Sequence, residues 1–497
     1  MAFRFKDLVI FEMANNHQGR LEHGLQIVEE MAGIAREYGI RAAVKLQYRD
    51  LETLIHPEFA QRTDVPHIPR FLATRLSWGE YQTLVAAIRD HGLTAVVTAF
   101  DEPSVEMALN HGADILKVAS CSCLDWPLLE TVARAGKPIL CSTGGCRLAD
   151  VDRIVTFLEH RQVADLALLH CVALYPTPDA QQHLGSMQRL MRRFPQWPIG
   201  YSGHEAPDNL RVVIAAVAMG ARILERHVGL PSETVTLNAY SMNPQQTRRW
   251  VEEILAARSL CGDAEAEPTV AQAEIDSLRS LQRGVFARRA IRQGEPLEPG
   301  SVFFAMPCRN GQTAARDYTE SLLAAQDYVP GEAIEQRRPV DSIQILRSVA
   351  HEAKGLLREA QIPVGPKYQV ELSHHFGIES IRRCGAVMID LFNREYCKKL
   401  IILLPGQSHP AHAHKAKEET FQLLYGEMEI TVDGQSSLMR PGDTQLIRRG
   451  QYHAFSTRTG CVLEEISTTH VRGDSIYSDA RIQRLDPIER KTVIQQW

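Results

Sequence analysis

The 497-residue sequence lacks a long apolar run, since no stretch approaches the roughly 18 to 20 residues that a membrane span needs. Its beginning, MAFRFKDLVIFE, lacks the plan of a signal peptide. Charge of one sign is also lacking: 55 Lys and Arg against 60 Asp and Glu give a formal net charge of −5, without a basic stripe. We therefore expect no membrane and no nucleic acid among its partners, and a cytoplasmic location.

The sequence also lacks paired Cys-x-x-Cys units, because its ten cysteines are scattered. This excludes the cysteine ladder of a zinc module. Cys141 and Cys171 lie inside apolar runs, so we expect reduced thiols that pack in the interior.

The first half of the chain contains a series of eight short apolar runs. They are Leu8–Ala14, Ala42–Tyr48, Thr94–Phe100, Ile115–Ser120, Pro138–Thr143, Leu166–Val172, Pro198–His204 and Arg222–Val228. Amphipathic stretches such as Leu21–Tyr38 separate them and are long enough for crossover helices. Near-continuous hydrophobic strands fit a parallel sheet buried on both faces, so the pattern predicts an α/β fold, a (β/α)8 TIM barrel.

Nearly every run ends in a polar or ionisable residue, and the carboxyl ends of the strands of such a barrel meet at one mouth. Lys45 and Lys117 supply positive charge for anionic oxygens, and neighbouring hydroxyls can donate hydrogen bonds to them. His204 and His227 end successive runs, so both imidazoles could bind one divalent cation. The alternative interpretations are solvated lysines at the rim and a strand-capping role for His227.

The composition changes in the second half of the chain, whose length predicts two or three domains. An acidic linker over 263–281 ends a barrel domain over 1–262. Short β-like pieces with a doubled Gly-Glu unit then predict a small pseudo-symmetric β domain over 282–340. A helical linker over 341–367 leads into a strand-rich domain over 368–497.

The ordered motifs of the first 262 residues resemble those of the sialic acid synthases. They are Glu12…Asn16-His17-x-Gly19, Lys45-x-Gln47, Thr98-Ala-Phe-Asp101, Lys117-Val-Ala-Ser120, Ser142-Thr-Gly144, Leu169-His-Cys171, Tyr175-Pro-Thr-Pro178, Gly200-Tyr-Ser-x-His204 and Glu225-Arg-His227. The 282–340 region resembles the carboxy-terminal antifreeze-like (SAF) domain of that family, a β-clip fold. The family also implies a domain-swapped homodimer, in which the SAF domain covers the partner's barrel.

The resemblance implies a carbon–carbon bond-forming transferase that condenses phosphoenolpyruvate with an aldose, giving a 3-deoxy-2-ulosonic acid of the nonulosonic type and phosphate. The residues implied for phosphoenolpyruvate are Lys45, Thr98, Lys117, Ser120, Ser142 and Ser202. A divalent metal, Mn2+ or similar, would bind His204 and His227. The candidate catalytic residues are Glu12, Lys117, Tyr175, His204 and His227. Glu12 would orient or deprotonate the water that adds to C2, or alternatively act as a structural carboxylate bonded to Asn16 or Lys45.

Three positions on the acceptor side depart from the family pattern. A carboxylate beyond the Lys-x-x-Ser serine has become Ser122, an aspartate after the eighth strand has become Leu237, and Lys-Arg-Pro of the SAF domain has become Ala305-Met306-Pro307. These changes remove charge-assisted contacts to the hydroxyls of the acceptor. We expect an aldose other than N-acetylmannosamine that is smaller, less polar or differently modified.

The last region resembles the cupin superfamily, whose fold is a β jelly roll. Its motifs are Gly406-x5-His412-x-His414-x4-Glu419-x6-Gly426 and Gly442-x5-Arg448-x-Gly450-x2-His453, with Arg448 in place of the usual proline. The predicted metal ligands are His412, His414, Glu419 and His453, a set suited to Mn2+, Fe2+, Zn2+ or Ni2+. Three further histidines fit no ligand spacing and are expected at the surface or behind the ligands: His374, His375 and His409.

The role of the cupin stays open at this point. The stretch from His412 to Glu419 is similar to sugar-isomerase cupins, in which Lys417 and Glu418 would move a proton; both could equally be solvated charges. The cupin would then isomerise or epimerise the sugar beside a condensing barrel, or only bind it. Two further hypotheses make a cupin isomerase the main activity, or make the chain a non-catalytic sugar-binding regulator.

Overall fold

The computed structural model describes residues 3, 5–62, 64–65, 67–263, 269–335, 342–366, 368–471, 473–486 and 488–494. The chain divides into two compact units, Met1–Thr269 and Val270–Trp497, and each has hydrophobic cores of its own. The predicted acidic linker falls in part on residues 264–268, and the predicted boundary at 340/341 falls on 336–341, both of which lie outside the described residues.

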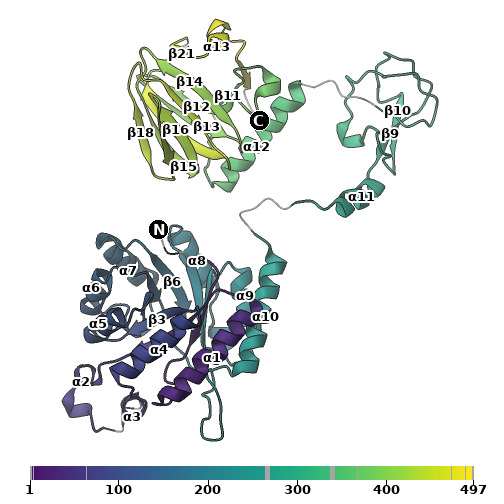
Figure 1. Ribbon diagram of the computed structural model, residues 1–497. Helices are drawn as coiled ribbons and strands as arrows, with labels where there is room; N and C mark the ends of the chain where they lie inside the picture. The colour runs from purple at the N-terminus through teal and green to yellow at the C-terminus, as the bar shows by residue number, and fades with distance from the viewer. Residues whose placement is uncertain are drawn as a thin grey trace. The chain divides into compact units, whose positions relative to one another are not determined.

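The first unit holds a closed barrel of eight parallel strands in sequence order (Figure 1). They are β1 (Leu8–Glu12), β2 (Ala42–Tyr48), β3 (Thr94–Ala99), β4 (Ile115–Val118), β5 (Ile139–Ser142), β6 (Leu166–Cys171), β7 (Ile199–Gly203) and β8 (Ile223–His227). Pairing of β1 with both β2 and β8 closes the sheet. The predicted (β/α)8 fold is confirmed, and each strand lies within the apolar run predicted for it.

Helices cover the outside of the barrel (Figure 1). The helices of this unit are α1 (Leu21–Tyr38), α2 (Leu51–Leu54), η1 (Pro57–Phe59), α3 (His67–Ala73), α4 (Trp78–Asp90), α5 (Glu102–Asn110), η2 (Ser120–Ser122), α6 (Trp126–Arg134), α7 (Leu148–His160), η3 (Asp179–Gln181), α8 (Gly185–Arg193), α9 (Arg211–Ala218) and α10 (Pro244–Cys261). The short α2, η1 and α3 lie at one end of the barrel rather than around it. α1 buries Ile27, Met31 and Ile34, at the spacing of one helix face, against the strands.

Alternation along each barrel strand separates two cores. On β1, Val9 and Phe11 pack in the core between strands and helices, whereas Leu8 and Ile10 pack in the barrel interior. The interior layer around Ile10 also contains Ala43, Val96, Ile115, Leu140, Leu169 and Ile223. Because the period of a strand is two, the next inward position on each of these strands lies one layer closer to the mouth.

Residues 269–335 form α11 (Gln272–Leu281), β9 (Gly284–Ala287), β10 (Val302–Ala305) and η4 (Ala315–Asp317). β9 and β10 pair antiparallel around a small core that includes Val285, Val302 and Ile334. A single bridge between Ile291 and Tyr328 joins the two copies of the repeated Gly-Glu unit. The predicted linker 263–281 therefore carries the helix α11, and the assignment of the β unit to the SAF class stays a prediction.

The carboxy-terminal region is a jelly roll of two sheets, as predicted. The seven-stranded sheet has the order β18-β15-β20-β13-β12-β11-β22 and the five-stranded sheet the order β17-β16-β19-β14-β21. The strands are β11 (Gln369–Ser373), β12 (Ala386–Asn393), β13 (Tyr396–Leu403), β14 (Ser408–His414), β15 (Glu419–Gly426), β16 (Met428–Val432), β17 (Gln435–Met439), β18 (Thr444–Ile447), β19 (His453–Ser456), β20 (Cys461–Thr468), β21 (Ser475–Tyr477) and β22 (Lys491–Ile494). The accompanying helices are α12 (Ser342–Glu359), η5 (Ile378–Ser380) and α13 (Ala480–Arg484). A core of Phe421, Leu423, Ile430 and Phe455 draws on both sheets.

The helix α12, predicted as part of a linker over 341–367, packs against this domain (Figure 1). Val349, Ala353 and Leu357 lie four residues apart on one face and are buried together with Val387 and Leu400 of the seven-stranded sheet. α12 is therefore part of the cupin core rather than a free connection.

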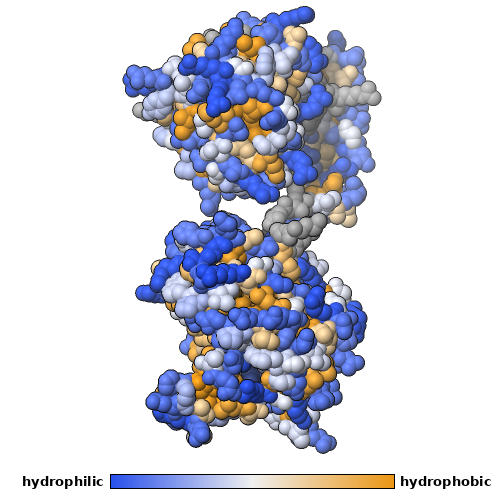
Figure 2. Space-filling view, turned by 60° about the vertical axis from the view of Figure 1, so that its left-hand side comes forward, coloured by the Kyte–Doolittle hydropathy of each residue, from blue (hydrophilic) through white to orange (hydrophobic). Residues whose placement is uncertain are grey.

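The surface is mixed in character, with hydrophilic residues predominating in the face shown in Figure 2. No helix in the described ranges combines the length and the hydropathy of a membrane span. All ten cysteines lie in described ranges and are free, and the Cys123 and Cys146 sulfurs are 3.1 Å apart.

Candidate active site at the barrel mouth and candidate metal centre in the cupin

A polar layer lies directly above the apolar interior of the barrel. Each strand contributes the residue that follows its interior position by two; on β7 the interior position is Gly200. These residues are Glu12, Lys45, Thr98, Lys117, Ser142, Cys171, Ser202 and Glu225. All eight are buried. Strand alternation alone therefore directs these side chains toward one point at the mouth.

Glu225 is the hub of this layer. Its carboxylate contacts Lys45 Nζ at 2.7 Å and Lys117 Nζ at 3.0 Å, and it accepts a hydrogen bond of 2.8 Å from Ser202 Oγ. Lys45 Nζ also lies 2.5 Å from Glu12 Oε2. Two ammonium groups and two carboxylates thus compensate one another in the barrel interior, where an unpaired charge would be costly.

The charges in this layer shift one another's protonation. Burial lowers the pKa of Lys45 to about 8, in spite of the opposing attraction of Glu225. Burial acts to raise the pKa of Glu225, but the charges of Lys117 and Lys45 outweigh it and hold that pKa well below its usual range. Glu225 is therefore an anion near neutral pH, and Lys45 is a cation that loses its proton at mildly alkaline pH.

One cavity of about 1090 Å³ opens at the mouth of the barrel. Every predicted site residue of the barrel lines it: Glu12, Lys45, Thr98, Lys117, Ser120, Ser142, Tyr175, Ser202, His204 and His227. Glu225 and Tyr240 line the same cavity. The structure thus brings together residues that are up to 215 positions apart in the chain (Glu12 to His227).

Hydroxyl groups of the cavity stand beside the lysines. Thr98 Oγ1 is buried and has no hydrogen-bond partner within the described residues. Ser120 Oγ accepts a hydrogen bond of 3.1 Å from the Gly144 backbone amide, which joins the ends of β4 and β5. A buried hydroxyl without a partner is a donor free for a ligand oxygen.

His204 and His227 lie together, with ring centroids 5.3 Å apart. His204 Nδ1 is 2.9 Å from the Val172 carbonyl oxygen, to which it can donate, so its Nε2 is left for another partner. His227 Nδ1 is buried and has no partner among the residues that the structure describes. Burial lowers the pKa of His204 to about 4 and that of His227 well below its usual value, so both rings are neutral at pH 7. Two neutral imidazoles with a free nitrogen each fit a divalent cation.

Glu12 is fully buried in the structure. Its Oε1 accepts a hydrogen bond of 2.6 Å from the Ala14 amide, while Oε2 faces Lys45. Asn16, the other partner considered for Glu12, donates instead to Val228 O and Ser241 Oγ. The contact with Lys45 keeps Glu12 within the polar layer, and its role as a base stays a prediction.

The three altered acceptor positions lie in different surroundings. Ser122 lines the cavity. Leu237 packs over Gly229, with its Cδ2 only 2.6 Å from where a Cβ at that glycine would stand, and is not among the lining residues. Met306 belongs to the other unit and is 66% exposed.

Two residues of the mouth were not singled out as site residues from the sequence. Glu225 belongs to the motif Glu225-Arg-His227 but was given no role, although its place two residues after the interior Ile223 carries the signal. Tyr240 lies in a segment without regular structure, where neither strand nor helix periodicity applies. Its position could not be inferred from a pattern.

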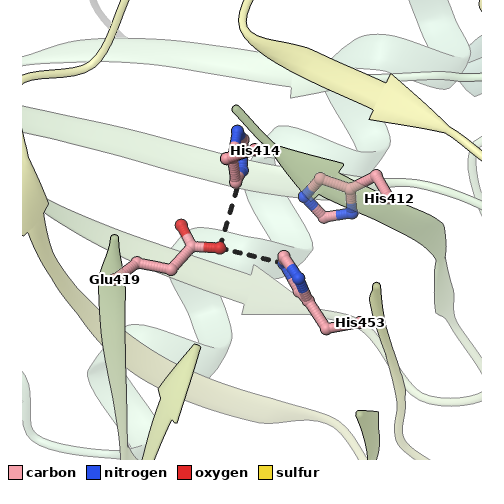
Figure 3. Close-up of side chains that lie close together, drawn as sticks. All are labelled: His412, His414, Glu419 and His453. Carbon is pink, nitrogen blue, oxygen red and sulfur yellow. Dashed lines mark ion pairs between the residues drawn. The ribbon is translucent and has the colours of Figure 1, made fainter. Parts of the chain in front are cut away.

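The cupin brings its four predicted ligands together (Figure 3). His412 and His414 come from β14, Glu419 from β15 and His453 from β19, and one ligand atom of each lies within 4.8 Å of the others. Glu419 Oε1 is 2.9 Å from His453 Nε2 and 3.5 Å from His414 Nε2. All four side chains are buried.

The outer ring nitrogens of these histidines are tied to the protein. Nδ1 of His412 lies 3.1 Å from Pro410 O, Nδ1 of His453 lies 3.3 Å from Gln451 O, and Nδ1 of His414 lies 3.5 Å from Asp474 Oδ2. Each Nε2 is thereby left to face the centre, the arrangement that metal-binding histidines adopt. Glu419 Oε1 and His453 Nε2 are buried and contact only other members of this cluster among the described residues, as expected of atoms that a cation would satisfy.

Lys417 is buried beside this cluster rather than solvated. Its Nζ contacts Glu419 Oε2 at 2.5 Å and Glu465 Oε1 at 2.9 Å. Burial acts to lower the pKa of Lys417, but Glu465 and Glu419 raise it above its usual value. Glu418 by contrast is exposed. Solvation is therefore the wrong interpretation for Lys417 and the right one for Glu418.

His374, His375 and His409, which were expected at the surface or behind the ligands, are also buried, so a surface position is wrong for all three. His375 Nε2 and His409 Nε2 are 3.1 Å apart, and the His409 ring lies 4.7 Å from that of His412. His374 contacts Thr492 Oγ1 at 3.0 Å. His375 and His409 line the small cupin cavity next to the ligands. They therefore lie behind the ligands, which was the alternative to a surface position.

The fold and the mouth of the barrel define a (β/α)8 enzyme with a cradle of buried cations, joined to a cupin with a ligand set for a metal. Residues 31–266 match the NeuB family, and residues 399–464 match the cupin domain. The chain belongs to the NeuB family, and the resemblance seen in the sequence is confirmed.

Individual relatives support this membership. The solved structure named spore coat polysaccharide biosynthesis protein E, from Chromobacterium violaceum, is 43% identical over 66% of this chain and 98% of that one, with a TM-score of 0.64. N,N'-diacetyllegionaminic acid synthase of Legionella pneumophila is 28% identical over 60% of this chain and 85% of the relative. N-acetylneuraminate-9-phosphate synthase of Drosophila melanogaster is 28% identical over 62% of this chain and 88% of the relative.

Proposed function

We propose that the barrel condenses phosphoenolpyruvate with an aldose and releases phosphate, as a synthase of a 3-deoxy-2-ulosonic acid. The observation that carries this proposal is the meeting of Lys45 and Lys117 with a ring of hydroxyls in one buried layer. Relatives named as synthases of legionaminic acid and of N-acetylneuraminate 9-phosphate support the reaction class.

The donor carries a carboxylate and a phosphate, and the cradle offers positive charge for both. Lys45 and Lys117 are held in place by Glu225, so their ammonium groups are already oriented before the donor arrives. Thr98 Oγ1 lacks a protein partner in the described part of the chain and is free to donate to a donor oxygen. Such preorganisation lowers the cost of binding a multiply charged anion in a buried site.

His204 and His227 are the residues that would hold a divalent cation at this mouth, since each keeps a ring nitrogen free and neutral. When bound there, such a cation supplies polarisation of the aldehyde carbonyl. The residues of the chain do the rest of the positioning. The two lysines hold the enol ester, so that its C3 faces the aldehyde.

The reaction forms one carbon–carbon bond and consumes one water. C3 of the enol attacks the aldehyde carbon, whose oxygen takes a proton from solvent and becomes a hydroxyl, and positive character develops at C2. The oxygen of water bonds to C2 as the water loses one proton. The bond between C2 and the phosphate oxygen then breaks, its electron pair leaves with the phosphate, and the proton of the new C2 hydroxyl passes to the phosphate as C2 becomes a ketone carbon. Glu12 is the proposed acceptor of the proton that this water loses, because it lies in the same layer as both lysines.

Phosphate release by the purified full-length chain tests the proposal. We expect release only when phosphoenolpyruvate, Mn2+ and a suitable aldose are all present. Lys117→Met should reduce the rate at least about 100-fold, because a buried charge-assisted contact is lost. Lys6→Met is a matched control, since Lys6 is exposed and precedes β1 at the opposite end of the barrel. Release without an aldose, or an unchanged rate in Lys117→Met, would contradict the proposal.

We also propose that the cupin binds a divalent transition metal through His412, His414, Glu419 and His453. The convergence of their free atoms within 4.8 Å supports this. Metal analysis of the purified protein should find one equivalent that His453→Ala loses. An unchanged metal content in that variant would contradict the proposal.

A second candidate function is interconversion of aldose and ketose at the cupin. The buried pair of Lys417 and Glu465 beside Glu419 favours it, because such chemistry needs an acid and a base near the metal. Incubation of the protein with aldoses in the absence of phosphoenolpyruvate should then yield ketoses. Without ketose formation, the cupin would instead bind or sense the sugar.

The domain-swapped homodimer implied by the family stays a proposal. Sedimentation of the full-length protein should give twice the chain mass of 55.7 kDa.

A further inference from the structure

The segment that follows β8 carries Tyr240 to the mouth of the barrel. Its end is pinned by the backbone, since Met242 N donates to His227 O at 2.9 Å and Gly229 N donates to Met242 O at 3.0 Å. The neighbouring Ser241 is buried and accepts a hydrogen bond of 3.1 Å from Asn16 Nδ2. Tyr240 therefore has little freedom to leave the position beside His227.

Tyr240 and Tyr175 form an aromatic wall beside the two histidines. The Tyr240 ring stands edge-on to His227, with centroids 5.0 Å apart and planes at 88°. The Tyr175 ring lies 5.1 Å from Tyr240 and 4.3 Å from His204. Both tyrosines line the cavity, and neither belongs to a hydrophobic core of the barrel.

The same segment withholds a charged group from the cavity. Leu237 is turned down onto Gly229, and Ser122, which lines the cavity, supplies only a hydroxyl. The rest of the cavity wall is mixed: Leu54, Ile55, Phe59 and Ile68 line it together with the charged residues Arg49, Arg70 and Asp125, and the Arg49 guanidinium lies over the rings of Phe71 and Phe100. The part of the wall next to His204 and His227 is thus aromatic, because Tyr175 and Tyr240 form it.

We infer that Tyr240, together with Tyr175, determines acceptor specificity by stacking on an aldose that presents a face of carbon-bound hydrogens. This inference rests on the proposed condensation with phosphoenolpyruvate. An aromatic ring covers such a face well and leaves its phenol oxygen for a hydroxyl or for water. An acceptor that is recognised only through its hydroxyls gains nothing from these rings, so the two tyrosines favour a sugar that presents an apolar face.

The test separates the acceptor from the donor. Full-length protein with phosphoenolpyruvate and Mn2+ is screened against D-mannose, N-acetyl-D-mannosamine, D-arabinose, L-rhamnose and L-fucose, and the fastest aldose is used. For Tyr240→Ala we expect the KM for the aldose to rise about tenfold or more, with the KM for phosphoenolpyruvate unchanged within about twofold. Tyr240→Phe should keep the aldose KM within about threefold, because the ring remains. Glu233→Ala, an exposed position in the same segment, is the matched control.

Each outcome decides a different point. A rise of both KM values together, no rise at all, or equal damage by Tyr240→Phe and Tyr240→Ala would overturn the inference. Absence of phosphate release from the unaltered protein with every aldose would count against the proposed condensation itself. If Tyr240→Ala does not fold, Tyr240→Leu, which keeps apolar volume without an aromatic ring, is compared with Tyr240→Phe in its place.

Discussion

The barrel mouth and the cupin centre are two buried polar sites built in opposite ways. At the barrel mouth, residues from eight strands spread over more than 200 positions surround an open cavity of about 1090 Å³, and two lysines offset two carboxylates. In the cupin, four ligands between residues 412 and 453 converge within 4.8 Å. The first arrangement presents cations to a large anionic ligand, whereas the second presents lone pairs to a small cation. One chain therefore holds a site suited to an anion in the barrel and a site suited to a cation in the cupin.

The largest expected effect is on phosphate release, and it distinguishes the barrel site from the cupin site. His204→Ala should reduce phosphate release about 1000-fold, because one of two barrel imidazoles is lost and several kcal/mol of polarisation go with it. His412→Ala should leave the rate within about twofold when the aldose is supplied directly. Both rates are measured with phosphoenolpyruvate and Mn2+ at equal protein concentration.

Metal content and thermal unfolding of the two variants are the controls. Equal loss of phosphate release from both, with the fold intact, would mean that the sites do not act separately.

The charge balance of the barrel layer predicts a large effect on stability. Glu225→Gln leaves two buried ammonium groups near each other without their shared counter-ion, so we expect the free energy of unfolding to fall by about 3 kcal/mol. The double variant Glu225→Gln with Lys117→Met should recover part of that loss. Denaturant unfolding measures both variants. If the losses of unfolding free energy simply add in the double variant, Glu225 and Lys117 are not energetically coupled and Glu225 is not the central residue of the layer.

The packing of α12 predicts a smaller effect on stability, which is confined to the cupin. Leu357→Ala removes a buried side chain between α12 and the seven-stranded sheet, and should destabilise the cupin by about 2 kcal/mol. Phosphate release should be unchanged at temperatures where both units are folded. Leu260→Ala, an exposed leucine, serves as the control. If Leu357→Ala and the unaltered chain have the same free energy of unfolding, α12 is a linker and not part of the cupin core.

The smallest effect concerns pH. Burial lowers the pKa of Lys45 to about 8, so its ammonium is charged below that pH and neutral above it. kcat/KM for phosphoenolpyruvate reports the free enzyme and should fall about tenfold from pH 7 to pH 9. Lys45→Arg, whose guanidinium keeps its proton in this range, should flatten that fall. An identical fall in both proteins would assign the titration to another group.

Different features of the sequence predicted the barrel strands and the cupin ligands, and each has a physical reason. The apolar runs placed all eight barrel strands, because a parallel barrel buries both faces of its sheet. The cupin ligands were found because His412, His414 and Glu419 lie within eight residues on two consecutive strands, one in each sheet. Short-range spacing therefore suffices where a site is local in sequence.

The remaining features depend on tertiary contacts that no local pattern encodes. Glu225 is the hub only because Lys45 and Lys117 reach it from other strands. Lys417 is buried only because Glu465 on β20 compensates its charge. Tyr240 reaches the mouth through the pairing of the segment after it with the end of β8.

The most direct measurement of the central claim uses water labelled with oxygen-18. The full-length protein is incubated in it with phosphoenolpyruvate, Mn2+ and the preferred aldose, and the released phosphate is analysed by mass spectrometry. Our account has water adding to C2 within the cradle of Lys45 and Lys117, so the phosphate should be unlabelled. Label in the phosphate would mean that water attacks phosphorus, and would contradict a carbon–carbon bond-forming synthase at the barrel mouth.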